Sequence, residues 1–138
     1  MSTYSLEEFY LDQVNKTLKK SKYTSSTWER IQEKSSTWLC YVYNENEFIG
    51  KLTFTFRPDF NSSRLIPLMV DIDFDTLLKK TGDVVNWNES RINDHNRFSC
   101  TYDFNDENTL RIVCINILKL LNVIKPKSFW NLFGLISN

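Results

Sequence analysis

The chain of 138 residues carries 17 basic and 17 acidic side chains, so its formal net charge at pH 7 is zero. Proteins that bind nucleic acid directly usually present a net basic face to the phosphates, and this balance argues against that class. The length suits one domain spanning residues 1–138, and an aromatic content of 14% is sufficient for a core without disulfides or metal ions.

The expected cellular location follows from the N-terminus, the apolar runs and the cysteines. The N-terminal segment has early acidic residues and no apolar core, unlike a signal peptide, and no apolar run is long enough to span a membrane. Cys40, Cys100 and Cys114 are far apart, odd in number and set in hydrophobic segments, as reduced core cysteines are. We therefore expect a cytoplasmic protein that does not bind membranes.

Two helices are predicted toward the N-terminus. Residues 5–20 begin with Ser5 and a glutamate three positions later, which is the spacing of a capping box. Acidic residues then come early, lysines come late, and apolar residues recur at helical spacing. A second capping box that starts at Ser26 predicts a short helix over residues 26–34.

Four later stretches alternate polar and apolar residues with the period of two that a half-buried strand requires. They cover residues 37–43, 48–57, 66–74 and 97–104. In the second stretch the inward row is predicted to contain Phe48, Leu52, Phe54 and Phe56. The first two stretches are separated by the turn-forming residues NENE and are expected to form a hairpin.

The C-terminal part is predicted to be helical again. Residues 106–122 confine their polar side chains to one arc and leave a wide apolar face, and residues 127–133 form a last short amphipathic segment. Helices that flank a run of antiparallel strands indicate the α+β class. We expect a mainly antiparallel sheet of about four strands with the helices on one face, the other face being polar.

Three aspartates, Asp71, Asp73 and Asp75, follow an apolar run at alternate positions. They do not form a calcium loop, because the glycine and the glutamate required at its sixth and twelfth positions are missing. Acidic side chains on the outward side of a strand usually pair with outward bases on the neighbouring strand, here Lys51 or Arg57. The other interpretation is an acidic stripe that binds a partner protein.

The longest polar stretch, residues 83–96, contains one tryptophan and the only histidine of the chain. Trp87 is either folded back onto the core or offered to a partner as an interface anchor. A single histidine excludes a histidine-rich metal site, and we interpret His95 as a solvated loop residue beside a turn.

The favoured functional hypothesis is a protein-binding domain that neutralises a partner, such as an immunity protein for an interbacterial toxin with nuclease activity. No glycine-rich phosphate loop, cofactor motif or metal motif is evident, so we expect no cofactor. The chain has no alanine, a bias typical of AT-rich mobile elements, and acidic groups on a sheet face would suit a basic active site. The predicted partner-binding residues are Asp71, Asp73, Trp87, Glu89 and Asp94.

Two alternatives stay open. The segments RPD at 57–59 and NESR at 88–91 are similar to the PD…(D/E)xK pattern of metal-dependent nucleases, with Arg91 in place of the lysine. A degenerate nuclease or hydrolase of this kind would use Asp59, Asp71, Asp73 and Glu89. A phage or mobile-element protein that modulates a host protein would share every feature of the favoured hypothesis.

Overall fold

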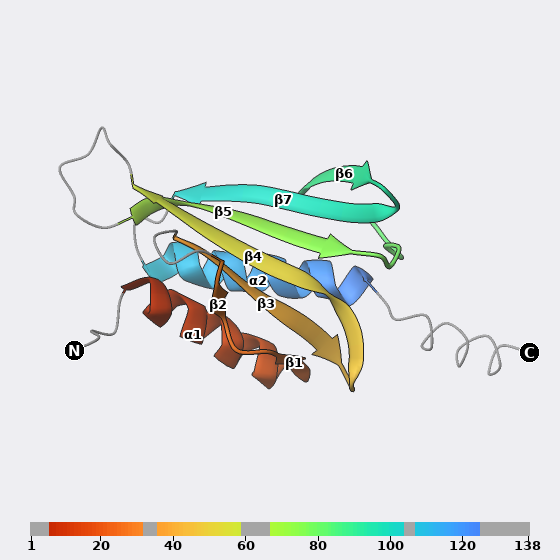
Figure 1. Cartoon of the computed structure of the whole chain (residues 1–138), viewed down its shortest axis with the longest axis horizontal. Helices are drawn as coiled ribbons and strands as arrows, with labels where there is room; N and C mark the ends of the chain where they lie inside the picture. The colour runs from red at the N-terminus through yellow and green to blue at the C-terminus, as the bar shows by residue number, and fades with distance from the viewer. Residues whose placement is uncertain (1–5, 32–35, 59–66, 104–106, 125–138) are drawn as a thin grey trace, which may run out of the picture.

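The main helices and strands of the described residues form where apolar side chains recur with the period of a helix or of a strand. The computed structural model describes residues 6–31, 36–58, 67–103 and 107–124, and Figure 1 shows their arrangement. In chain order the elements are α1 (Leu6–Lys20), β1 (Tyr23–Ser25), β2 (Glu29–Arg30), β3 (Thr37–Asn44), β4 (Glu47–Pro58), β5 (Pro67–Thr76), β6 (Asn88–Ile92), β7 (His95–Asp103) and α2 (Glu107–Val123).

The strands form one antiparallel sheet in the order β1-β3-β4-β5-β7-β6, and β2 pairs with the same edge of β3 as β1 does. The α+β class and the mainly antiparallel sheet are therefore confirmed. The four predicted strands correspond to β3, β4, β5 and β7. The predicted number of strands was wrong, because three short edge strands, β1, β2 and β6, bring the sheet to seven.

Both helices pack against one face of this sheet, with α1 beside α2 (Figure 1). The helix predictions for 5–20 and 106–122 are confirmed as α1 and α2, whereas the predicted helix 127–133 lies outside the described residues. The core joins the buried faces of both helices to alternate residues of the central strands, and each fully buried large apolar side chain contributes about 1.5–3 kcal/mol. Its largest fully buried members include Leu11, Leu18, Leu52, Phe54, Ile72, Phe74, Phe98, Ile117 and Leu121.

The helix predicted over residues 26–34 does not form in the described part of that segment. Ser26 instead joins the edge of β3, where its backbone N–H donates to the carbonyl oxygen of Tyr41 at 2.9 Å. The backbone N–H of Tyr41 in turn donates to the Ser26 hydroxyl at 2.8 Å, and β2 pairs with β3 a few residues further on. The edge of β3 presents backbone groups that need partners, and this pairing overrides the local capping signal.

A β-bulge changes the facing of side chains at the start of β4. Val42 lies opposite Gly50 but the next residue, Tyr43, lies opposite Phe48, so Ile49 is an extra residue in β4. Ile49 consequently turns into the core, with 1% of its surface exposed, and Phe48 turns outward with 47% exposed. The prediction that Phe48 points inward was wrong, because strict alternation does not hold across a bulge.

The second half of the polar stretch 83–96 forms a hairpin at the edge of the sheet, from β6 (Asn88–Ile92) into the start of β7. Strand β6 is joined to β7 by a two-residue turn, Asn93–Asp94, with φ angles of 50° and 67°. Asparagine and aspartate tolerate this left-handed backbone better than most residues, which accounts for their presence in the turn.

Neither helix of the described ranges has the length and apolar character needed to cross a bilayer.

Candidate functional site

The face of the sheet opposite the helices is the candidate functional surface, and no helix of the described residues covers it (Figure 1). We call it the open face. Its rows run across β3, β4, β5 and β7, because residues paired in register point to the same side. The three central rows are Thr37, Thr55, Asp71, Thr101; Leu39, Thr53, Asp73, Ser99; and Tyr41, Lys51, Asp75, Arg97.

Asp71 is held within the open face by two neighbouring strands. Arg57 on β4 approaches both carboxylate oxygens, with Nε 2.7 Å from Oδ2 and Nη2 3.0 Å from Oδ1, and the Thr101 hydroxyl on β7 donates to Oδ1 at 2.7 Å. Burial raises the pKa of Asp71, but the bonds from Thr101 and Arg57 outweigh it, so the pKa lies below its ordinary value. The predicted pairing of an outward aspartate with Arg57 is present, and it engages Asp71.

Asp73 and Asp75 have different surroundings. Burial raises the pKa of Asp73; Arg97 opposes this rise, and the charges of Asp71 and Asp75 add to it. Asp75 instead pairs with His95, whose Nδ1 lies 2.7 Å from Oδ1. His95 is the first residue of β7, so it belongs to the sheet rather than to a loop as expected.

The other three predicted binding residues lie elsewhere. Trp87 is only 8% exposed, and its indole N–H donates to the carbonyl oxygen of Asn116 on α2 at 3.3 Å, so its side chain belongs to the core. Glu89 is paired in register with the core residue Phe98, which places it on the helix side of the sheet. Asp94 occupies the β6–β7 turn. Of the five predicted residues, the structure brings together only the two aspartates of β5.

The residues proposed for a metal-dependent nuclease are likewise separated. Asp71 and Asp73 face the open side, whereas Glu89 faces the helix side and pairs with Lys80 at 2.8 Å. Asp59 lies outside the described residues. In the described ranges no group of three or more histidine, cysteine or carboxylate side chains has the proximity that a metal ion requires.

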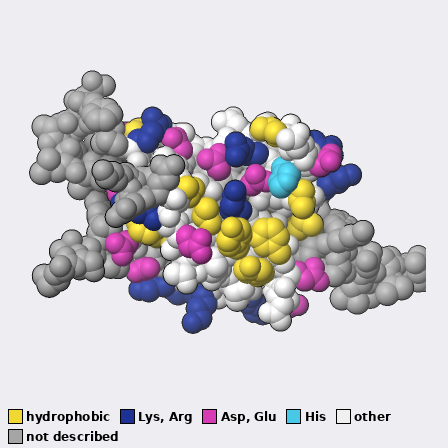
Figure 2. Space-filling view, in the orientation of Figure 1, with side chains coloured by type: hydrophobic (Ala, Val, Ile, Leu, Met, Phe, Trp, Pro, Cys, Tyr) yellow, Lys and Arg dark blue, Asp and Glu magenta, His cyan; other side chains and the backbone are white. Residues whose placement is uncertain are grey.

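An aromatic cluster that was not predicted lies at one end of the open face and is formed by Tyr41, Tyr43 and Phe48. The Phe48 ring centroid lies 6.0 Å from that of Tyr41 and 5.7 Å from that of Tyr43. Tyr41 is 37% exposed, and Phe48 is exposed because of the β-bulge. Figure 2 shows hydrophobic side chains gathered over this part of the face, with His95 close by. Only the strand register reveals the cluster, since the alternation places Phe48 inside.

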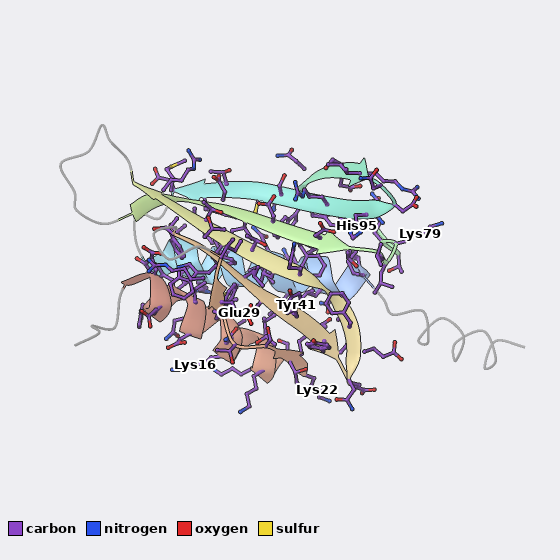
Figure 3. All side chains as sticks on the ribbon, in the orientation of Figure 1. Lys16, Lys22, Glu29, Tyr41, Lys79 and His95 are labelled. Carbon is purple, nitrogen blue, oxygen red and sulfur yellow. The ribbon has the colours of Figure 1, made fainter. Side chains whose placement is uncertain are left out.

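Beside the aromatic cluster the open face is hollowed and carries charges of both signs. A hollow of about 250 Å³ is lined by Asp75, Ile92, Asn93, His95 and Arg97. Lys51 and Arg97 stand on either side of Asp75 in register, and Tyr41 follows next to Lys51. Figure 3 labels Tyr41 and His95 at the two ends of this region.

In protein–protein interfaces, aromatic residues and arginine are the side chains that most often act as anchors. No family model, no curated protein and no solved structure matches this chain.

Proposed function

We propose that the protein binds a partner protein through the open face of its sheet and neutralises it, as an immunity protein neutralises a toxin. The observation that carries this proposal is the aromatic cluster of Tyr41, Tyr43 and Phe48, in which Tyr41 and Phe48 are exposed, on a face that no described helix covers. Apolar side chains are more stable when another surface covers them than when they are exposed to water. A partner protein provides that burial, because an interface of ordinary size covers several strands of such a face.

The arrangement of carboxylates supports a binding role over catalysis. The Asp71 carboxylate is occupied by Arg57 and Thr101, and that of Asp75 by His95. A metal-dependent hydrolase would instead need carboxylates that converge on a shared position with open coordination sites. The nuclease alternative would therefore require Asp71 to leave its present partners.

The partner class that we propose is a toxin of the nuclease type, acting in the same cytoplasm as this protein. A phage or mobile-element protein that modulates a host protein would use the same face, so the two proposals differ only in the identity of the partner. Both predict that the open face is buried in the complex and that the helix layer is not.

The test is a comparison of captured partners between variants. The tagged wild-type protein, a Phe48→Ser variant and an Ile112→Ser variant are incubated with native lysate, and retained proteins are identified by mass spectrometry. Ile112 is a matched control, because it is an exposed apolar residue, 44% exposed, on α2. Loss of an aromatic anchor typically costs about 2 kcal/mol or more, roughly 30-fold in Kd.

We expect the wild type and Ile112→Ser to retain one protein in stoichiometric amount and Phe48→Ser to lose it. The wild type should also inhibit the activity of the captured protein, measured as DNA or RNA degradation if it is a nuclease, and Phe48→Ser should not. Equal retention and inhibition by all three proteins would refute the open face as the binding surface. Capture without any inhibition would refute neutralisation.

A further inference from the structure

Strand β6 ends the sheet on the side away from α1, as Figure 1 shows. All five of its residues are exposed, and among the described strands it pairs only with β7. At the opposite end of the sheet the edge is divided between β1 and β2, which have only three and two residues. Because an edge strand presents backbone N–H and C=O groups without partners, β6 is the longest such edge that the structure describes.

The hairpin turn fixes which backbone groups of β6 point away from the sheet. Ile92 and His95 flank the two-residue turn, and residues in these positions exchange both backbone hydrogen bonds. Hydrogen-bonded and non-hydrogen-bonded pairs alternate along an antiparallel ladder, so every second residue counted back from Ile92 bonds to β7. The N–H and C=O groups of Glu89 and Arg91 therefore point outward, and they have no backbone partner in the described ranges.

A second copy of β6 that lies antiparallel to the first satisfies all four of these groups in one symmetric register. With Ser90 opposite the same serine of the second copy, each Glu89 lies opposite the Arg91 of the other chain. Both of these pairs exchange two backbone hydrogen bonds, and both bring opposite charges together. A register centred on Glu89 or on Arg91 forms only one hydrogen-bonded pair within β6 and places like charges opposite each other.

The ion pairs that Glu89 and Arg91 already make do not occupy this position. Lys80 Nζ contacts Oε1 of Glu89 at 2.8 Å, so Oε2 has no partner among the residues that the structure describes. Arg91 Nη2 lies 3.6 Å from Oδ1 of Asp94, and both side chains are largely exposed. So long and exposed an ion pair contributes little, and the Arg91 guanidinium has further donors for a second carboxylate.

We propose that the protein forms a weak dimer in which the β6 strands of two copies pair antiparallel about a twofold axis at Ser90. The two sheets become one continuous sheet, and the open faces of both copies lie on the same side. Charged residues on an edge strand usually prevent pairing by repulsion, but the charges at positions 89 and 91 are self-complementary. The interface is separate from the aromatic cluster, so the inference does not rest on the proposed function.

The strength of this dimer is limited by the length of the strand. An interface of two five-residue strands is smaller than the roughly 1,200 Å² of a stable complex, so we expect a Kd of about 10 µM or higher.

The first test places a cysteine at either of two positions of β6. In the proposed register the two Ser90 residues form a non-hydrogen-bonded pair with Cα atoms about 4.5 Å apart, which suits a disulfide. The two Asn88 residues lie about 14 Å apart, beyond the reach of a disulfide. Ser90→Cys, Asn88→Cys and the wild type, which controls for the native cysteines, are oxidised and compared on non-reducing gels. We expect Ser90→Cys to form a linked dimer about tenfold faster than Asn88→Cys.

The second test exchanges the charges and follows association by sedimentation velocity. Glu89→Arg alone places two arginines opposite each other, and Arg91→Glu alone places two glutamates opposite each other, so the Kd of each variant should rise about tenfold or more. An equimolar mixture of the two variants restores opposite charges in both pairs and should associate as the wild type does, which also shows that both variants are folded. Lys16→Glu makes a matched charge change on an exposed position of α1 and should leave the Kd unchanged (Figure 3 labels Lys16).

Three results would overturn the inference. A wild-type protein that stays monomeric up to about 1 mM would refute pairing with a second copy and leave the β6 edge to a strand of another protein. Equal cross-linking of Ser90→Cys and Asn88→Cys would refute the register. Association that is lost with Phe48→Ser but unaffected by either charge variant would assign the dimer to the aromatic cluster instead of β6.

Discussion

Gly50 offers the sharpest test of the packing that shapes the open face. It lies on the core side of β4, next to the bulge, where a Cβ atom would be 2.5 Å from Cζ of Phe74 and 2.7 Å from the backbone oxygen of Asp75. Favourable contacts between carbon atoms lie at about 3.5–4.0 Å, so a Gly50→Ala methyl group would be about 1 Å too close to Cζ of Phe74. It would also be too close to the oxygen of Asp75.

The overlap cannot be relieved by one side chain alone. Phe74 is fully buried, and the oxygen of Asp75 belongs to the backbone of β5, which is paired on both sides by β4 and β7. Overpacking of a core costs typically 1–3 kcal/mol, and a clash with backbone places Gly50→Ala at the upper end, about 3 kcal/mol. For a chain of this length such a loss corresponds to a decrease in Tm of about 10 °C.

The assay is urea unfolding followed by tryptophan fluorescence, with the free energy of unfolding taken from the midpoint and slope. Gly82→Ala is the matched control, because its Cβ would lie 3.4 Å from a methyl carbon of Val123 and needs no displacement. We expect the control to stay within about 0.5 kcal/mol of the wild type. A Gly50→Ala protein as stable as Gly82→Ala would refute the strand register at the bulge, and with it the outward position of Phe48.

Three further predictions concern side chains of the central strands. Thr76→Val should lower the free energy of unfolding by about 1–3 kcal/mol, because the buried Thr76 hydroxyl donates to the carbonyl oxygen of Ile49 at 2.5 Å and accepts from the backbone N–H of Leu78 at 3.0 Å. Thr76→Ser, which keeps the hydroxyl, should lose less in the same urea measurement, and an equal loss in both variants would contradict this role. The native pKa of Asp73 is raised, so the native state binds the carboxyl proton more tightly than the unfolded chain does. The wild type therefore loses stability as pH rises from the unfolded pKa through the native pKa. Asp73→Asn has no such proton, so its free energy of unfolding should increase relative to that of the wild type as pH rises. Urea midpoints of both proteins at about pH 3 and about pH 7 check it, and a gain confined to the acidic side would refute the sign. Burial raises the pKa of the Cys40 thiol to about 12, so iodoacetamide should not label this cysteine in the native protein but should label it in the unfolded protein. Peptide mass spectrometry measures the labelling, and rapid labelling of the native protein would contradict the burial of Cys40.

The sequence alone was sufficient to predict the elements whose burial repeats regularly. The alternation along β3, β5 and most of β4 records one face on the core and one in water, and the stripes of α1 and α2 record their contact with the sheet. For the same reason the outward direction of Asp71 and Asp73 followed from the pattern, whereas only the register of β4 with β5 decided that Arg57 rather than Lys51 pairs with Asp71. These directions depend on near neighbours in the chain, and they therefore appear as periodicity.

Which side chains the candidate surface exposes and pairs is decided by contacts between segments that are distant in the sequence. The exposure of Phe48 comes from a shift in the pairing of β3 with β4, and the engagement of Asp75 comes from His95, twenty residues away. From the sequence, Trp87 could belong either to the core or to an interface. It is a core residue because it packs on α2, where its indole N–H donates to the carbonyl oxygen of Asn116. Local sequence determines which side of a strand is apolar, but the register between strands decides which side chains meet, and that register is a property of the whole sheet.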